Sequence, residues 1–210
     1  MKRSSLAVLI FVAASVCLGS RAGAQVFYSM PGARPVSDAS PALGLAAGFG
    51  DNVFRLSGFG RFNASPSADF GLEFAYDDID SGPGSDDTGL LGGGADFKYL
   101  AVRQGETTPV DAAVMVGAGF LTHSDYTLIR VPLGTMVSRS FPLKDGRDVT
   151  PFAAVDLIMD FWDTGGGHNS DVDVELRLGA SAEIVDRAAL FAAFHLGTGT
   201  MFFLGFAASL

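Results

Sequence analysis

The chain has 210 residues, with 14 basic against 23 acidic side chains and a formal net charge of −9. An acidic chain of this kind lacks the basic surface that nucleic acids require, so we expect no nucleic-acid partner. Its length allows one domain. Cys17 is the only cysteine in the sequence, so intramolecular disulfide bonds cannot stabilise the fold.

The N-terminal residues show the three parts of a secretory signal peptide. Lys2 and Arg3 come first, and the apolar run LAVLIFVAASVCLG follows at 6–19. Ala22 and Ala24 then form a small-residue cleavage motif. The run is shorter than the roughly 18 to 20 apolar residues that a membrane-spanning helix needs. The sequence therefore predicts a signal peptide at 1–24, removed after Ala24 on export.

Residues 25–40 contain Pro31 and Pro35 and show no periodicity, so we expect an irregular N-terminal arm. From 41 to 210 no stretch shows a convincing 3.6-residue apolar period, and short segments alternate between apolar and polar residues instead. We therefore predict an all-β domain over 41–210. The expected strands cover 41–49, 53–62, 67–77, 89–101, 110–121, 126–140, 149–162, 172–184, 188–196 and 200–210.

The segment SDVDVELRLGASAEI at 170–184 shows this alternation most clearly. Val172 and Val174 share one face with the leucines that follow them, whereas Asp173 and Glu175 share the other. In a soluble half-buried strand the charged face would point to water. In a membrane barrel the apolar face points to lipid and the charges point into the barrel. The segment alone fits both arrangements.

The connections between the expected strands separate into two sets. One set falls at one end of ten up-and-down strands, here called the turn end, together with both ends of the domain; it comprises the connections near 63–67, 103–109, 142–148 and 185–187. The other set falls at the opposite end, here called the loop end, and comprises the connections near 50–52, 78–88, 123–125, 163–171 and 197–200. This parity is typical of a closed antiparallel transmembrane β-barrel with an even number of strands. Eight strands are the alternative if the first or ninth hairpin is misread.

Strand length and aromatic placement favour the membrane barrel. The expected strands match the roughly 9 to 11 residues of a tilted membrane strand and exceed the roughly 5 to 6 residues common in soluble sheets. Aromatic residues also cluster near the strand ends, as in the interfacial girdles of membrane barrels. They are Phe62, Phe70, Tyr99, Phe141 and Phe152 near the turn end, and Tyr76, Tyr126 and Phe161 near the loop end.

The final stretch, MFFLGFAASL, places Phe202, Leu204, Phe206 and Leu210 on one face. This alternating apolar strand resembles the last strand of small outer-membrane β-barrels of the OmpA-like and porin-like kind. The resemblance implies that the four residues form a C-terminal signal read by the barrel-insertion machinery. Members of that family usually end in Phe, whereas this chain ends in Leu210.

If the polar faces point inward, the barrel lumen holds charges of both signs, which must be paired or hydrated in a narrow interior. We expect an ionic network that fills the lumen, with a narrow cation-selective pore as the alternative. Its expected members are Arg55, Arg61, Asp69, Glu73, Asp96, Lys98, Arg130, Asp156, Asp160, Asp173, Glu175, Arg177 and Glu183.

No catalytic or cofactor motif stands out, and we expect neither enzymatic activity, a cofactor nor a metal site. The acidic loop at 77–87 lacks the spacing of a calcium-binding EF-hand and is expected to be a solvated loop. His168 and Ser170 invite comparison with lipid A-modifying outer-membrane hydrolases, with Glu175 as the third group. We expect these two in a glycine-rich loop, where nothing fixes their geometry. His123 is expected in a loop, and His195 in the lumen.

The sequence thus predicts a small protein of the bacterial outer membrane with a structural, surface-contact or narrow-pore role. Its expected partners are outer-membrane lipid, the insertion machinery and small ions or solutes if the lumen conducts. The second hypothesis is an exported soluble, lipocalin-like barrel that binds an apolar ligand. The remote third hypothesis is the lipid A-modifying hydrolase.

Overall fold

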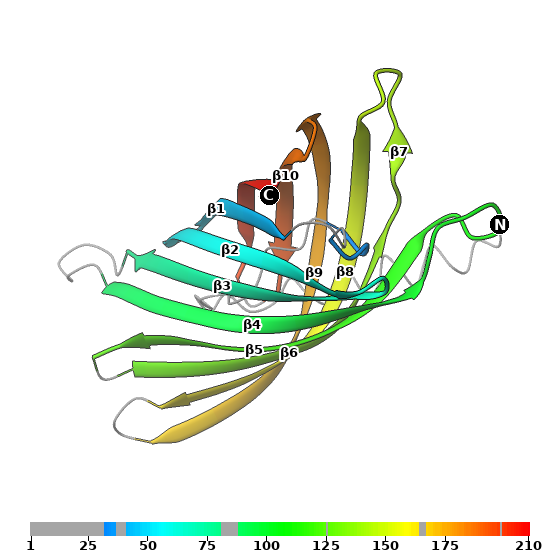
Figure 1. The fold of residues 1–210 in the computed structure, drawn as a ribbon. Coiled ribbons are helices and arrows are strands. Elements are labelled where there is room, and N and C mark those ends of the chain that lie inside the picture. The colour runs from blue at the N-terminus through cyan, green and yellow to red at the C-terminus, as the bar shows by residue number, and fades with distance from the viewer. Residues whose placement is uncertain (1–31, 37–40, 81–87, 125, 164–166, 198) are drawn as a thin grey trace, which may run out of the picture.

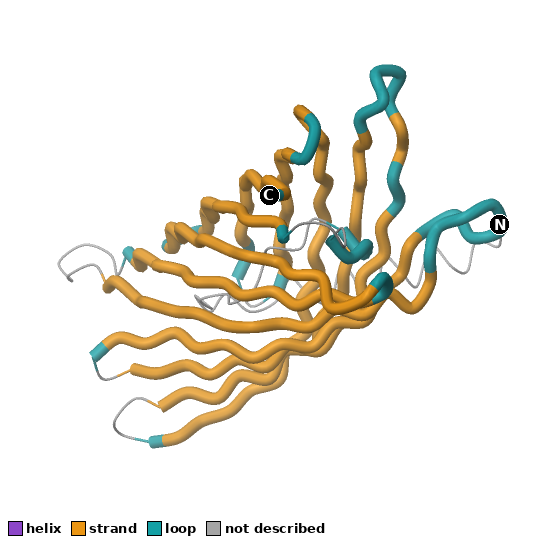
Figure 2. Tube along the Cα trace, viewed as in Figure 1, coloured by secondary structure: helices purple, strands orange, loops and turns teal. Residues whose placement is uncertain are grey.

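The computed structural model describes residues 32–36, 41–80, 88–124, 126–163, 167–197 and 199–210. The predicted signal peptide, with Ala22 and Ala24, lies outside these residues. Figure 2 shows the described chain as strands and connecting loops, and none of its segments is a helix long and apolar enough to cross a membrane. The strands are β1 (Ala42–Gly50), β2 (Val53–Ser65), β3 (Ala68–Ile79), β4 (Thr88–Val102), β5 (Asp111–His123), β6 (Tyr126–Ser138), β7 (Phe141–Pro142), β8 (Asp148–Asp163), β9 (His168–Val185), β10 (Ala188–Leu196) and β11 (Met201–Ser209).

The long strands form one closed antiparallel barrel. Each long strand pairs with its neighbours along the chain, and β1 pairs with β11 to close the ring, as Figure 1 shows. The two-residue β7 pairs only with the start of β8, so β6 pairs directly with β8. Ten strands therefore make up the wall, which confirms the prediction of a ten-stranded barrel and excludes the eight-stranded alternative. Closure leaves the sheet without a continuous exposed edge.

Successive connections alternate between the two ends of the barrel as predicted, with one difference. The turn end carries the connections at 66–67, 103–110, 139–147 and 186–187, and the loop end carries those at 51–52, 80–87, 124–125, 164–167 and 197–200. The predicted glycine-rich loop at 163–171 is shorter than expected, because β9 begins at His168. Residues 168–171 pair with the last residues of β8, which extends the β8–β9 hairpin beyond the predicted strand at 172–184.

Apolar side chains cover the outside of the barrel. On β9 the exposed residues are Val172 at 60%, Val174 at 48% and Leu178 at 42%, while Glu175 and Arg177 between them are buried inside. The same alternation recurs on the other long strands, for example with Phe74 at 74% on β3. An apolar surface that surrounds the whole barrel far exceeds what soluble monomers expose. The apolar face of the alternating segment at 170–184 therefore points outward, as a membrane barrel requires.

Two residues of the expected aromatic girdles point inward instead. Phe152 is 7% exposed and packs in an apolar cluster with Met115 and Phe203. Tyr126 packs against Leu128 inside the loop end. Both residues share the parity of the inward-facing residues of their strands, so their side chains cannot reach the interface.

Glycines on the inner wall make room for large aromatic side chains. A Cβ atom on Gly48 of β1 would lie 2.5 Å from Cε1 of Phe203 on β11. A Cβ atom on Gly179 of β9 would lie 2.5 Å from Cζ of Phe152 on β8. Because each ring occupies the space that a Cβ atom on the neighbouring glycine would take, only glycine fits there without a clash. This packing accounts for these two glycines in strand interiors.

Candidate functional site in the barrel lumen

Two arginine–aspartate pairs bridge neighbouring strands on the inner wall, one on each side of the lumen. Arg55 on β2 donates from Nε to Oδ1 of Asp77 on β3 at 2.6 Å and from Nη2 to Oδ2 at 2.9 Å. Arg130 on β6 donates from Nε to Oδ1 of Asp160 on β8 at 2.7 Å and from Nη2 to Oδ2 at 2.5 Å. In both pairs the residues are direct cross-strand partners. Two-point contacts of this kind fix geometry as well as charge.

A third group of charges joins β8, β9 and β10. Arg177 donates to both carboxylate oxygens of Asp156, at 2.7 and 3.0 Å. Glu175 lies on the same strand as Arg177, and its Oε1 is 3.2 Å from Nδ1 of His195. All four side chains are buried, so each charge is compensated by a neighbour rather than by bulk water.

A fourth cluster lies toward the turn end. Arg61 on β2 donates from Nη2 to Oδ1 of Asp69 at 2.6 Å and to Oδ1 of Asp96 at 2.8 Å. The Lys98 ammonium lies 3.3 Å from the other oxygen of Asp69. Two cations therefore share two carboxylates across β2, β3 and β4. The cluster joins three consecutive strands through their inner faces.

Eleven of the thirteen predicted lumen residues are buried, at 7% exposure or less. The two others lie near the ends of β9: Asp173 is half-buried, and Glu183 is exposed at the turn-end rim, where it accepts a hydrogen bond from the Asp148 backbone. The structure brings the predicted residues together as separate pairs and small clusters around the wall.

Two ionisable residues of the lumen, Asp77 and Asp111, are absent from the predicted network, and both are 0% exposed. His195, which was expected in the lumen, is 1% exposed. Asp77 was expected in a solvated acidic loop, and this expectation is wrong because β3 continues through Asp77 to Ile79. Its spacing of two and four residues from Ala75 and Glu73 already places it on their face. Asp86 and Asp87 of the same loop lie outside the described residues.

Apolar side chains separate these charged groups. Leu90, Leu121 and Leu128 pack together inside the loop end, with Ile79, Tyr126 and Trp162 against them. Met115, Met136, Phe152 and Phe203 belong to a larger cluster in the lumen. This layer could not be predicted from alternation, because several of the strands that supply it are apolar on both faces. Apolar side chains therefore fill much of the space between the charged groups.

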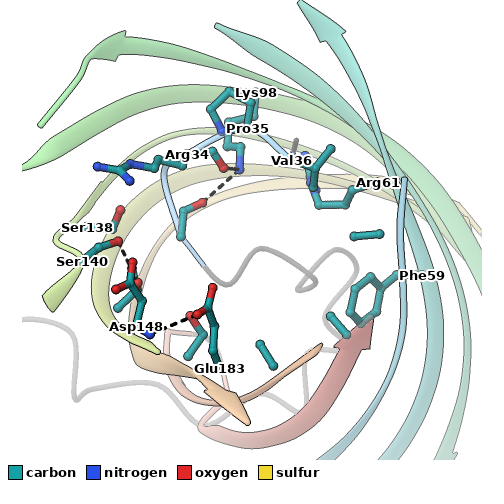
Figure 3. Close-up of a pocket in the computed structure, with 16 residues that line it drawn as sticks. Arg34, Pro35, Val36, Phe59, Arg61, Lys98, Ser138, Ser140, Asp148 and Glu183 are labelled. Atoms are coloured by element: carbon teal, nitrogen blue, oxygen red, sulfur yellow. Dashed lines mark hydrogen bonds between the residues drawn. The ribbon is translucent and has the colours of Figure 1, made fainter. Parts of the chain in front are cut away.

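The turn end of the lumen contains a cavity of about 260 Å³. Figure 3 shows it between the N-terminal arm, the Phe59 ring and a polar wall that includes Ser140 and Glu183. The arm residues 32–36 lie inside this mouth. Within the described chain, no group of three or more His, Cys, Asp or Glu side chains is arranged to hold a metal ion.

The residues of the hydrolase hypothesis do not assemble. His168 lies at the start of β9, with Nδ1 3.2 Å from Oδ2 of Asp163 on β8, and its side chain is 88% exposed. Ser170 is exposed on the same strand. Glu175 points into the lumen beside His195. The expectation that His168 and Ser170 lie in a loop is wrong, and the strand that holds them directs Glu175 to the opposite face.

The placement of charge and apolar surface defines the class of the protein. A soluble barrel that carries an apolar ligand needs an apolar interior and a polar exterior, whereas this barrel has an apolar exterior and buries paired charges inside. Closed walls, an apolar exterior and paired charges inside are the features of a transmembrane β-barrel. The chain thus has the fold of an outer-membrane β-barrel.

Comparisons with solved structures agree with this class. The β domain of the Bordetella autotransporter BrkA matches with a TM-score of 0.53 and 13% identity, covering 81% of this chain and 99% of that domain. LpxR from Salmonella typhimurium matches with a TM-score of 0.51 and 8% identity, covering 80% of this chain and all of that one. A KdgM porin matches with a TM-score of 0.42 and 8% identity, covering 80% and 99%.

No family model and no curated protein matches the sequence. The structural matches therefore show the fold, and the expected resemblance to outer-membrane barrels is confirmed at that level.

Proposed function

We propose that this protein resides in the outer membrane as a closed barrel with a structural or surface-contact role. The observation that carries the proposal is the burial of paired charges in the lumen. Eight acidic and five basic side chains of the inner wall are at most 7% exposed. Ions that cross a pore need water or polar groups along their path, and this lumen offers them packed side chains instead.

The location can be tested by membrane fractionation followed by a gel with and without boiling. A membrane barrel stays folded in detergent and migrates differently before heating. We expect the protein in the outer-membrane fraction with a heat-dependent shift. Release as a soluble band that heating does not shift would overturn the proposed location.

The closed lumen can be tested by single-channel recording in a planar bilayer. We expect no steady conductance from the wild-type barrel. The matched comparison is an Arg55→Ala, Asp77→Ala variant, which removes one buried pair and leaves its neighbours in place. A wild-type conductance equal to that of a water-filled pore would contradict the closed lumen.

A narrow cation pore is the second candidate, favoured by the excess of eight acidic over five basic buried side chains in the described lumen. An acidic lining attracts cations and repels anions. Under a salt gradient, such a pore would show a reversal potential on the cation-selective side. The closed barrel would show no stable current from which to measure one.

Lipid contact and assembly belong to the same proposal. Phe202, Leu204 and Phe206 lie on the outward face of β11, and Leu210 is 63% exposed beyond it. We propose that these residues contact lipid and present the signal for barrel insertion. An OmpA-like or porin-like affiliation fits this assignment. Polar substitutions at Leu204 and Phe206 should slow assembly in cells, whereas polar substitutions on the 103–110 turn should not.

We also propose that the protein is not an enzyme. The support is the separation of His168 and Ser170, on the outer side of β9, from Glu175 inside. Mass spectra of lipid A from cells with the wild-type chain and with His168→Ala should be identical. A lipid A species that depends on His168 would overturn this part of the proposal.

A further inference from the structure

The N-terminal arm lies inside the turn end of the lumen and is held there by side chains from five strands. Lys98 on β4 donates from Nζ to the carbonyl oxygens of Gly32 at 2.9 Å and of Arg34 at 2.8 Å. Figure 3 shows Lys98 directed toward the arm, with Arg34, Pro35 and Val36 beside it. Lys98 is 1% exposed, so its ammonium depends on these carbonyls and on Asp69.

The other contacts also reach the arm's backbone. The Ala33 amide donates to Oγ of Ser138 on β6 at 3.0 Å. The Val36 amide donates to Oδ2 of Asp69 on β3 at 3.0 Å, and the Val36 carbonyl accepts from Nδ2 of Asn63 on β2 at 2.9 Å. Four side chains thus form hydrogen bonds with five backbone groups of residues 32–36. Backbone groups are common to all extended peptides, so these contacts do not depend on the side chains of the bound segment.

Two contacts select particular side chains. Ala33 is 0% exposed and packs in the apolar cluster with Leu100 and Met136, a position that favours a small side chain. Arg34 donates from Nε to Oδ2 of Asp111 at 2.7 Å, and Asp111 is almost completely buried. The site therefore combines backbone contacts with a small-residue niche and a carboxylate for a basic residue.

We propose that the turn-end mouth of the barrel is a binding site for an extended peptide, occupied in cis by residues 32–36. The site selects a small residue followed by arginine, and the neighbouring cavity of about 260 Å³ gives a competing peptide room to enter. The arm is covalently joined to β1 through a few residues, so its effective concentration is in the millimolar range or above. A peptide in trans therefore competes only when the binding of the arm to this site is weakened.

Occupation in cis is tested by a disulfide trap in the full chain with Cys17 replaced by serine. A Cβ atom on Gly32 would lie 3.9 Å from Cβ of Ser138, within the range that disulfides adopt. We expect Gly32→Cys, Ser138→Cys to oxidise readily in the folded, heat-modifiable protein. Gly105→Cys, Ser138→Cys is the matched control, because a Cβ on Gly105 has no neighbour within 4 Å. Failure of the first pair to cross-link in folded protein would overturn the cis assignment.

Binding in trans is tested with a fluorescent peptide of residues 29–38, SMPGARPVSD, by anisotropy in detergent. Arg34→Glu weakens the binding of the arm to the lumen, because it places a second carboxylate beside Asp111. The Arg34 side chain is 46% exposed, so the substitution does not disturb the buried side chains of the lumen. We expect the variant to bind the peptide about 100-fold more tightly than wild type, as loss of an intramolecular competitor predicts. The oxidised Gly32→Cys, Ser138→Cys chain should not bind it, and reduction should restore weak binding.

The selectivity of the site is tested with two altered peptides. Versions carrying Ala33→Trp or Arg34→Glu should lose at least about tenfold in affinity for the Arg34→Glu chain, because each removes one of the two selective contacts. Equal binding of all three peptides would refute the selectivity. Peptide binding to Arg34→Glu no tighter than to wild type, with a normal gel shift, would refute the site itself. If Arg34→Glu fails to fold, Ala33→Trp in the full chain replaces it.

Discussion

Arg55 and Asp77 lie directly opposite each other on β2 and β3, joined by two hydrogen bonds, and both side chains are completely buried. The two charges therefore compensate each other inside the barrel. Asp77→Asn removes the carboxylate that Arg55 contacts at two points, and loss of one partner of a buried pair costs about 3 to 5 kcal/mol. We expect a matching drop in unfolding free energy, measured by urea titration in detergent with fluorescence of Trp162, the single tryptophan.

Two controls separate pairing from burial. Replacing both partners with apolar residues, Arg55→Met and Asp77→Leu, should recover most of the lost stability, because buried pairs are often no more stabilising than apolar packing. Asp145→Asn, in the exposed turn before β8, should not shift the urea midpoint. Arg147 donates hydrogen bonds to Asp145 and so lowers the pKa of its carboxyl, but both groups are in water. A double variant as unstable as Asp77→Asn would contradict the pairing.

The outward face of β9 offers a depth-dependent test of lipid contact. Leu178 lies in the middle of the paired region, next to Phe194 on β10 and Ala153 on β8, whereas Ile184 lies six residues closer to the turn. An arginine in the middle of a barrel wall costs about 2 to 4 kcal/mol, and one near the interface costs about 0 to 1 kcal/mol. We expect Leu178→Arg to reduce the folded fraction in lipid vesicles strongly and Ile184→Arg to reduce it little. Equal effects would argue against a membrane-spanning wall.

How much of this structure the sequence could predict depends on the physical signal at each position. Glu175 and Arg177 alternate with valine and leucine, so the alternation places them on the face opposite the apolar residues. The prediction of a membrane barrel then directs that face into the lumen. Asp77 was missed although it has the same parity as Glu73, because aspartates near a glycine-rich segment also suggest a loop. His168 was assigned to a loop because the three glycines before it suggested an earlier end to the strand pairing.

The N-terminal arm lies beyond what local pattern can predict. Pro31, Pro35 and the absence of periodicity predict an irregular segment, and residues 32–36 are irregular. Their place inside the lumen depends on Lys98 and Asp111, which are 64 and 77 residues away from Arg34 along the chain. Side chains that meet only after barrel closure leave no periodic signal. The same holds for the layer around Leu121, where both faces of the strand are apolar.

Gly146 in the β7–β8 turn and Gly105 in the β4–β5 turn allow a matched test of backbone conformation. Gly146 has a φ of 83°, a conformation that residues with a Cβ atom adopt at a cost of about 1 to 2 kcal/mol. Gly105, in the turn after β4, has open space around it and no such φ. We expect Gly146→Ala to lower the unfolding free energy by about 1 kcal/mol. Gly105→Ala should leave the urea midpoint unchanged or raise it slightly, and equal losses at both sites would refute the turn geometry.

Glycine and aromatic residues on the inner wall form pairs whose coupling can be measured. A Cβ atom on Gly48 would meet only side-chain atoms of Phe203 among its three nearest neighbours. Gly48→Ala should therefore destabilise the barrel by about 1 to 3 kcal/mol, the usual cost of overpacking. Phe203→Leu in the same chain should relieve much of that loss, because a smaller side chain frees the contact.

Gly44 provides the contrasting case on the same strand. A Cβ atom there would meet both the Phe59 ring and the backbone carbonyl oxygen of Phe206 on the neighbouring strand. Phe59→Leu can move the ring but cannot move the carbonyl without breaking the β1–β11 pairing that closes the barrel. We expect Gly44→Ala to stay destabilised in the Phe59→Leu background, whereas Gly48→Ala is rescued by Phe203→Leu. Double-mutant cycles from urea unfolding give both coupling energies. A rescue at Gly44 as large as that at Gly48 would show that the paired strands β1 and β11 can shift relative to each other.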